Sequence, residues 1–246
     1  MNLVIDVGNT HTKVAVFDSE KVVSIHKLDQ FSLKGIKALV IKHPAIKKVI
    51  LSSVIRHDKS SVRFLKGKYE FIELSHTTRI PIKNKYSTQS TLGKDRLACA
   101  VGSNARFRNK NVLCIDAGTC IKYDFVNSKN EYLGGAISPG IDMRFKALEH
   151  FTDKLPLISY THFNKLIGNS TRESILSGVV VAAGEEVKGF VAQYKKKHPN
   201  LKVILTGGNL EFLQGIFNIA GNKNSSIFAD PCLLLKGLNY ILNYNI

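Results

Sequence analysis

The sequence has few cysteines and no long hydrophobic run. Four cysteines occur among 246 residues, at positions 99, 114, 120 and 232, and none forms a Cys-x-x-Cys pair. This spacing argues against a disulfide framework or a structural zinc site and favours a reducing compartment. No segment approaches the roughly 18 apolar residues of a membrane span. The amino terminus also lacks the basic and long apolar regions of a signal peptide, so we expect a cytoplasmic protein with no membrane partner.

Acidic residues are scarce. The chain has 19 Asp and Glu against 35 Lys and Arg, which gives a net charge of +16. The basic residues are scattered, and the densest run, Lys195–His198, precedes Pro199 where we expect a helix to end and cations to complement its dipole. No zinc finger, aromatic RNA-binding motif or helix-turn-helix is recognisable. We therefore expect a solvated basic surface and no nucleic-acid partner.

A short pattern occurs twice. Residues 3–10 read Leu-Val-Ile-Asp-Val-Gly-Asn-Thr, and residues 113–119 read Leu-Cys-Ile-Asp-Ala-Gly-Thr. Each copy predicts a buried strand, a glycine-bearing turn and a second strand, and a repeat at this distance indicates a duplicated unit. Glycine permits a tight turn whose backbone amides face a phosphate. One copy alone would equally fit an ordinary hairpin with a capping threonine.

Each copy carries an aspartate, Asp6 or Asp116, at the end of its first strand. A buried carboxylate is costly unless it accepts hydrogen bonds or holds a cation. We assign a divalent ion to Asp6, which leaves Asp116 without an evident partner. Lys122 is six positions on, along the expected second strand, so we do not count it as that partner. A weakly hydrated monovalent cation at Asp116 would resolve the conflict.

Apolar periodicity predicts an α/β layout with a mixed sheet in each half. The expected strands are 3–7, 13–17, 22–25, 49–52, 71–74, 112–116, 123–126, 134–138 and 203–206. The expected helices are 33–42, 95–107, 143–151, 171–197, 210–217 and 231–242. A basic, Asn-containing stretch at 106–111 suggests a boundary, so we expect one domain at 1–108 and a second at 109–246.

The duplicated hairpin resembles the two phosphate loops of the actin/Hsp70/sugar-kinase superfamily. The first loop matches Asp6–Lys13 and the second matches Asp116–Asp124. The resemblance implies two similar RNase H-like domains of the actin/Hsp70 ATPase type, each with a mixed sheet flanked by helices.

Further motifs resemble the type III pantothenate kinases. Gly93-Lys94-Asp95-Arg96 matches that family's Gly-x-Asp-Arg signature, with Tyr86 seven residues before the glycine. In order along the whole chain follow similarities at 132–140 (Tyr-Leu-Gly-Gly-Ala-Ile-Ser-Pro-Gly), 168–178 (Gly-Asn-Ser-Thr-Arg-Glu-Ser-Ile-Leu-Ser-Gly) and 206–209 (Thr-Gly-Gly-Asn). The sequence departs from the family at 87–91, where a proline is usual, and at 179–183, where aromatic residues and glycine are usual.

Each of these motifs, taken alone, also fits an ordinary structural role. Asp95 could be a helix N-cap, and Ser170 with Glu173 fits a capping box that would leave Thr171 only at a helix entry. Tyr86 could be a half-buried loop aromatic, and Gly207-Gly208 could merely join a strand to a helix. The case for function rests on their joint occurrence.

The resemblance implies the reaction and the site. The reaction is ATP-dependent phosphorylation of pantothenate to 4′-phosphopantothenate, the first step of coenzyme A biosynthesis, in a homodimer that uses Mg²⁺ with ATP and potassium or ammonium. Asp95 would be the general base, Asp6 would hold Mg²⁺ and Asp116 the monovalent cation. The expected ATP-binding residues are Asp6, Val7, Gly8, Asn9, Thr10, His11, Thr12, Lys13, Thr119, Gly207 and Gly208. The His11 side chain itself is not expected to be a ligand. The expected pantothenate-binding residues are Tyr86, Gly93, Lys94, Asp95, Arg96 and Thr171.

Two other functions stay open, and the dimer has some support beyond the resemblance. The same machinery could act on another small hydroxylated acceptor, or the chain could be a non-catalytic regulatory member, which would be expected to lose a catalytic carboxylate. The apolar stretch 175–183 favours a dimer independently, as a face that needs a partner.

Overall fold

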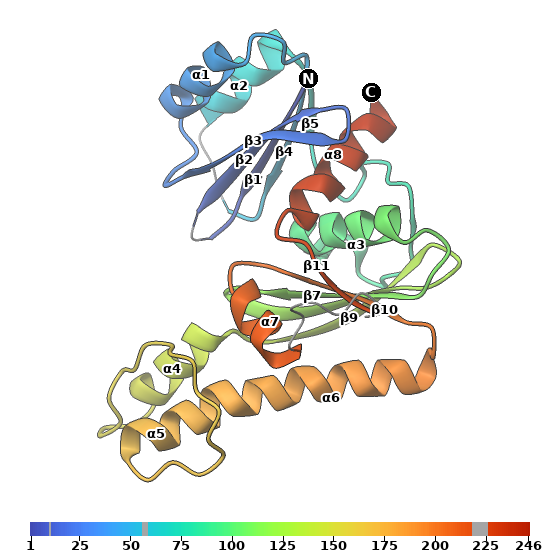
Figure 1. The fold of residues 1–246 in the computed structure, drawn as a ribbon. Coiled ribbons are helices and arrows are strands. Elements are labelled where there is room, and N and C mark those ends of the chain that lie inside the picture. Colours follow the sequence, from blue (N-terminus) through green and yellow to red (C-terminus); the bar gives the residue numbers. More distant parts are fainter. Residues whose placement is uncertain (10, 56–58, 218–225) are drawn as a thin grey trace. The chain divides into compact units, whose positions relative to one another are not determined.

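The computed structural model describes residues 1–9, 11–55, 59–217 and 226–246, and Thr10 lies outside this part of the chain. The described residues form two compact units (Figure 1). The first unit contains Met1–Arg108, Asn130–Tyr132 and Cys232–Ile246, and the second contains Asn109–Lys129 and Leu133–Pro231. The division at 108/109 expected from the sequence placed the C-terminal helix in the second domain, whereas the contacts of this helix assign it to the first unit.

A mixed five-stranded sheet forms the centre of the first unit, in the order β3-β2-β1-β4-β5. Strands β1 and β2 form the first predicted hairpin, and β4 runs parallel to β1. Every residue of β1 is buried because helices cover both faces of the sheet, which explains its unbroken apolar character. The strands are β1 (Asn2–Val7), β2 (Thr12–Asp18), β3 (Lys21–Leu28), β4 (Lys48–Ser53) and β5 (Glu70–Glu73).

Helices α1 (Leu33–Lys42) and α2 (Lys59–Lys68) pack on one face of this sheet. Helix α1 begins where the Ser32 side chain accepts a hydrogen bond from the Gly35 amide at 3.3 Å. Helix α8 (Leu233–Asn245) contacts β1 and β4 and packs closely on α3 (Lys94–Arg106). The close approach needs glycine, because a Cβ at Gly102 would lie 2.7 Å from the Leu233 carbonyl oxygen.

The second sheet has the order β11-β10-β7-β8-β9-β6. Strands β7 and β8 form the second predicted hairpin, and β10 runs parallel to β7. The short β6 pairs with Glu131 and Tyr132 at the start of β9, and these residues belong to the first unit. The strands are β6 (Lys83–Asn84), β7 (Val112–Ala117), β8 (Cys120–Val126), β9 (Glu131–Pro139), β10 (Lys202–Thr206) and β11 (Ile227–Ala229).

Helices of the second unit pack against its strands around an apolar core. Helix α5 continues through a π-helical segment (Ser177–Val181) into the long α6, as expected for 171–197. Ile175, Leu176, Val179, Val180 and Ala183 are all buried in this core. Most of the apolar side chains in the stretch 175–183 are therefore covered within the unit, whereas Gly178 and Ala182 are exposed and Val181 is half-buried. The helices are α4 (Ile141–His150), α5 (Thr171–Leu176), α6 (Ala182–Lys197) and α7 (Leu210–Phe217).

The α/β fold class with two mixed sheets flanked by helices is confirmed. The Lys195–Lys197 run lies in the last turn of α6, as expected. Helix α2, the one-turn helix Gln89–Thr91 and the short strands β6 and β11 were not expected. Among the helices that the structure describes, none has the length and apolarity to cross a bilayer.

Candidate active site

The first predicted phosphate turn joins β1 and β2. Their register places Asp6 opposite Lys13 and Val7 opposite Thr12. The Gly8 amide donates a hydrogen bond to the His11 carbonyl oxygen at 3.1 Å, which closes the turn. Asp6 is 8% exposed at the end of its strand, as predicted. The hairpin thus brings the predicted residues on both sides of Thr10 into one turn, while the Asn9 side chain is exposed.

The second predicted turn joins β7 and β8, where the Gly118 amide donates to the Cys120 carbonyl oxygen at 3.0 Å. Asp116 lies directly opposite Lys122 in the antiparallel register. The Lys122 Nζ is 2.6 Å from the Asp116 carboxylate. The expectation that Lys122 is too far along the strand to serve as partner is wrong, because the tight turn brings position 122 back beside position 116. Desolvation of Asp116 therefore gives no separate argument for a monovalent cation.

Two further segments of the second unit close around this turn. The Asn209 amide donates to the Ala117 carbonyl oxygen at 2.9 Å, and the Gly140 amide donates to the Thr119 carbonyl oxygen at 3.1 Å. Gly207 has φ +104°, and a Cβ there would lie 2.5 Å from the Asp116 carboxylate. The structure thus brings Gly207 together with Asp116 and the Gly118–Thr119 turn, while Thr119 and the neighbouring Gly208 remain exposed.

The predicted acceptor residues of the first unit gather at the start of α3. Gly93 is the N-cap, and Asp95 lies in the first helical turn, so Asp95 is not the cap of this helix. A Cβ at Gly93 would lie 2.6 Å from the Asp95 Oδ1, so a larger residue there would displace the Asp95 side chain. The Arg96 guanidinium lies over the Tyr86 ring, 5.6 Å from its centroid. Arg96 is 5% exposed, whereas Asp95 and Tyr86 are half-buried.

Thr171 belongs to the second unit, as the first residue of α5, and is exposed. The preceding Ser170 caps the helix by accepting a hydrogen bond from the Glu173 amide at 3.2 Å. Glu173 in turn accepts from the Asn169 amide at 3.2 Å and from Lys165 Nζ at 3.0 Å. Hydrogen bonds from Lys165 and Asn169 lower the pKa of Glu173. Ser170 and Glu173 are thus accounted for by helix entry, while the Thr171 side chain faces solvent.

The described residues contain no cluster of three or more His, Cys, Asp or Glu side chains that could hold a metal ion by themselves. Mg²⁺ in phosphotransferases, however, is commonly held by one or two carboxylates together with substrate phosphates. The buried Asp6 carboxylate at the first turn fits that arrangement. Asp116 fits a cation less well, since the Lys122 ammonium group already contacts it.

A cavity of about 630 Å³ lies in the second unit beside α6. Its lining residues include none of the predicted site residues; they are Phe125, Leu133, Glu186, Gly189, Phe190, Gln193, Tyr194, Lys197 and His198.

Known proteins resemble this chain over its whole length. The sequence model described as "Type III pantothenate kinase" matches residues 2–193. A type III pantothenate kinase from Christiangramia forsetii is 45% identical over 248 residues, covering 100% of this chain and 99% of the relative. A solved structure described as a Baf family transcriptional activator from Campylobacter jejuni has a TM-score of 0.59 at 22% identity, covering 99% of this chain and 98% of that one. Another, described as an N-acetylmannosamine kinase from Listeria monocytogenes, has a TM-score of 0.55 at 12% identity, covering 99% and 98%. The two structures share the actin-like ATPase fold with this chain.

Proposed function

The chain belongs to the type III pantothenate kinase family, and from this premise we propose that it transfers the γ-phosphoryl group of ATP to the hydroxyl group of pantothenate. The product, 4′-phosphopantothenate, would enter coenzyme A biosynthesis. The observation that carries the proposal is the full-length family match combined with an intact set of carboxylates, Asp6, Asp95 and Asp116. A regulatory member without activity would not be expected to keep all three.

The two glycine turns are proposed to bind the ATP phosphates. The first turn would contribute the backbone amides of residues 8–10 and the Lys13 side chain, and the second turn would contribute Thr119 with the neighbouring Gly207 and Gly208. Phosphoryl transfer depends mainly on positioning and charge neutralisation. Mg²⁺, held by Asp6 and the phosphates, would supply part of that neutralisation.

Asp95 is proposed as the general base that accepts the proton of the pantothenate hydroxyl as its oxygen bonds to the γ-phosphorus and ADP leaves. A positioned carboxylate suffices for an alcohol that loses its proton late in the reaction. The contact between Arg96 and Tyr86 supports their assignment to one acceptor site beside Asp95. A guanidinium binds a carboxylate through two parallel hydrogen bonds, and pantothenate has one carboxylate. Gly93, Lys94 and Thr171 complete the proposed acceptor residues.

Potassium or ammonium dependence, a homodimer and a cytoplasmic location are also proposed. The cation and the dimer rest on the family resemblance, because Lys122 contacts Asp116 and most apolar side chains of the stretch 175–183 are buried within the unit. The location rests on the four cysteines, whose spacing favours a reducing compartment.

Release of ADP, measured with purified protein, Mg²⁺ and potassium, tests the function. Pantothenate is expected to stimulate ADP release strongly, and a panel of sugars and other hydroxy acids is expected to have little effect. Stimulation by a different acceptor, with none by pantothenate, would show that the machinery serves another substrate.

A further inference from the structure

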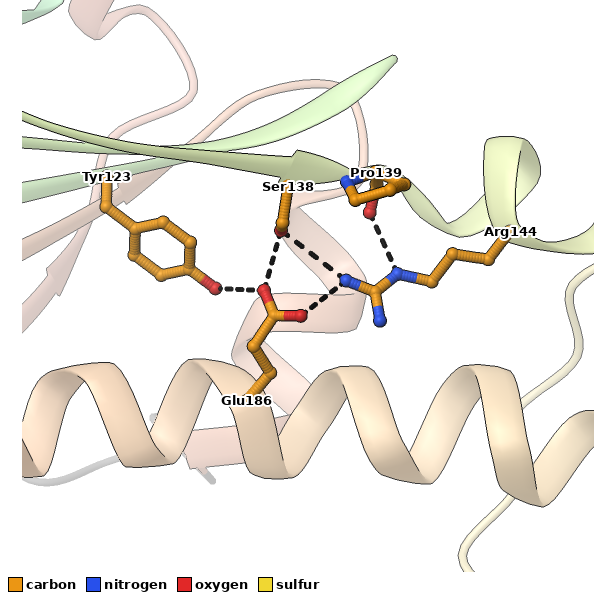
Figure 2. A network of polar contacts seen from close by, with 5 residues as sticks. All are labelled: Tyr123, Ser138, Pro139, Arg144 and Glu186. Carbon is orange, nitrogen blue, oxygen red and sulfur yellow. Dashed lines mark hydrogen bonds and ion pairs between the residues drawn. The ribbon is translucent and has the colours of Figure 1, made fainter. Parts of the chain in front are cut away.

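A polar cluster in the second unit is centred on Glu186 and Arg144, which lie outside the sequence motifs, and its other members, Tyr123 and Ser138, lie in the segments 116–124 and 132–140. Figure 2 shows Glu186 reaching from α6 toward side chains of β8, β9 and α4. Its Oε1 accepts hydrogen bonds from the Tyr123 hydroxyl at 2.9 Å and the Ser138 hydroxyl at 2.6 Å. Its Oε2 accepts from the Arg144 guanidinium at 2.5 Å. We call Tyr123, Ser138, Arg144 and Glu186 the Glu186 cluster.

The cluster is partly shielded from water and its charges are matched. The side chains of Arg144 and Glu186 are 19% and 25% exposed. Burial raises the pKa of Glu186, but hydrogen bonds from Ser138, Arg144 and Tyr123 outweigh it and lower the pKa overall. Burial and the Glu186 carboxylate both raise the pKa of Tyr123. At neutral pH, Glu186 is therefore a carboxylate that accepts from three donors.

Two members of the Glu186 cluster flank Gly140 in the sequence. Ser138 lies two residues before Gly140, and Arg144 lies four residues after it. The Arg144 Nε also donates to the Pro139 carbonyl oxygen at 2.9 Å, as Figure 2 shows, and the Arg144 amide donates to the Gly140 carbonyl oxygen at 3.0 Å. The segment Ser138–Gly140 is thus tied to Glu186 through side chains that approach it from either direction.

Gly140 in turn packs directly on the second glycine turn. Besides its hydrogen bond to the Thr119 carbonyl oxygen, Gly140 is so close that an added Cβ would lie 2.5 Å from that oxygen and 2.8 Å from the Thr119 carbonyl carbon. A displacement of Ser138–Gly140 toward the turn would therefore shift the backbone of Gly118–Thr119, because Gly140 lies in direct contact with it.

We propose that Glu186 is a positioning residue for the nucleotide: it holds Ser138–Gly140 in place and thereby fixes the Gly118–Thr119 turn for the ATP phosphates. The inference rests on the proposed function in one respect, the binding of phosphates at this turn. Glu186 itself acts only through Ser138, Arg144 and Gly140. Preorganisation of a phosphate-binding backbone affects nucleotide affinity first, because a displaced turn must be restored on each binding event.

The substitution Glu186→Gln tests this role with little change in volume. The carboxamide of glutamine accepts hydrogen bonds only at its oxygen, so its NH₂ group must face hydrogen-bond donors of the cluster. The matched control is Glu185→Gln on the same helix, whose side chain is 64% exposed and forms an i,i+3 ion pair with Lys188. We expect E186Q to raise KM for ATP and the ADP dissociation constant by about tenfold, the effect of losing a charged hydrogen bond. We expect KM for pantothenate to stay within about twofold, and E185Q to match the unmodified protein.

Tyr123→Phe provides a second variant in case E186Q does not fold, because it removes one donor and keeps the ring that stacks on Phe190 at 4.2 Å. A smaller rise in the same two nucleotide constants is expected. Calorimetric titration with Mg-ADP separates this inference from the proposed function, because it needs no acceptor. If both variants lose thermal stability but bind ADP as E185Q does, Glu186 is only structural and the inference fails. It also fails if the unmodified protein does not bind ADP.

Discussion

Gly207 offers the sharpest test of how the second glycine turn is built. Its φ of +104° is a conformation that L side chains rarely adopt. An added Cβ would overlap the Ala117 carbonyl group, 2.7 Å from its carbon, and would lie 2.5 Å from the Asp116 Oδ1. Both neighbours are constrained, since the Ala117 oxygen accepts from Asn209 and the Asp116 carboxylate contacts Lys122. The methyl group cannot be accommodated without moving the turn.

The cost of Gly207→Ala follows from these two effects. Backbone strain at positive φ costs about 1–3 kcal/mol, and forced backbone displacement in a packed site adds about 1–3 kcal/mol. We therefore expect the free energy of unfolding to fall by about 3 kcal/mol, which lowers the melting temperature by roughly 6–12 °C in a protein of this size. The affinity for Mg-ADP should fall as well, because the displaced residues include the proposed phosphate turn.

Gly208→Ala is the matched control, one residue further along. No atom lies within 4 Å of an added Cβ there, and its φ is outside the positive range. Thermal unfolding of the nucleotide-free proteins should leave G208A within about 1 kcal/mol of the unmodified protein. If G207A melts within 2 °C (about 1 kcal/mol) of G208A, the described geometry around Gly207 is wrong.

Three further predictions concern catalysis and assembly. Asp95→Asn should lower kcat by at least about 100-fold with ADP affinity nearly unchanged, because a general base contributes that much; near-normal turnover would make Asp95 structural. Potassium or ammonium should support higher activity than sodium when each salt is titrated at constant ionic strength, which removes screening of this basic protein as a cause; equal rates would leave Lys122 as the relevant cation at Asp116. Light scattering should give the mass of a homodimer, and a monomeric mass at working concentrations would remove that proposal.

Local signals in the sequence predicted much of the fold. Helix α1 begins and ends where expected, at Leu33 and Lys42, because a capping serine and a regular apolar spacing mark it. Helix α2 was missed because its sequence is mostly polar and basic, with few buried side chains, Ser61 and Leu65, to form an apolar stripe. Strands β6 and β11 are only two and three residues long, too short for a periodic pattern.

Tertiary contacts explain what the sequence could not predict. The apolar stretch 175–183 suggests a face that needs a partner, because sequence alone does not show that Ile175, Leu176, Val179, Val180 and Ala183 pack into the core of the second unit. The contact between Lys122 and Asp116 was accessible in principle, since the turn of three residues, 118–120, between the paired residues Ala117 and Ile121 fixes the register. The contacts of Glu186 could not be predicted from the sequence, because its partners come from three other elements with no common spacing.

The central claim is that this protein phosphorylates pantothenate. Mass spectrometry of the reaction of purified protein with pantothenate, ATP, Mg²⁺ and potassium tests it most directly. The account predicts a product heavier than pantothenate by one phosphoryl group, formed in step with ADP and nearly lost in Asp95→Asn. Folded protein that binds Mg-ADP but forms no phosphorylated pantothenate under these conditions would contradict it.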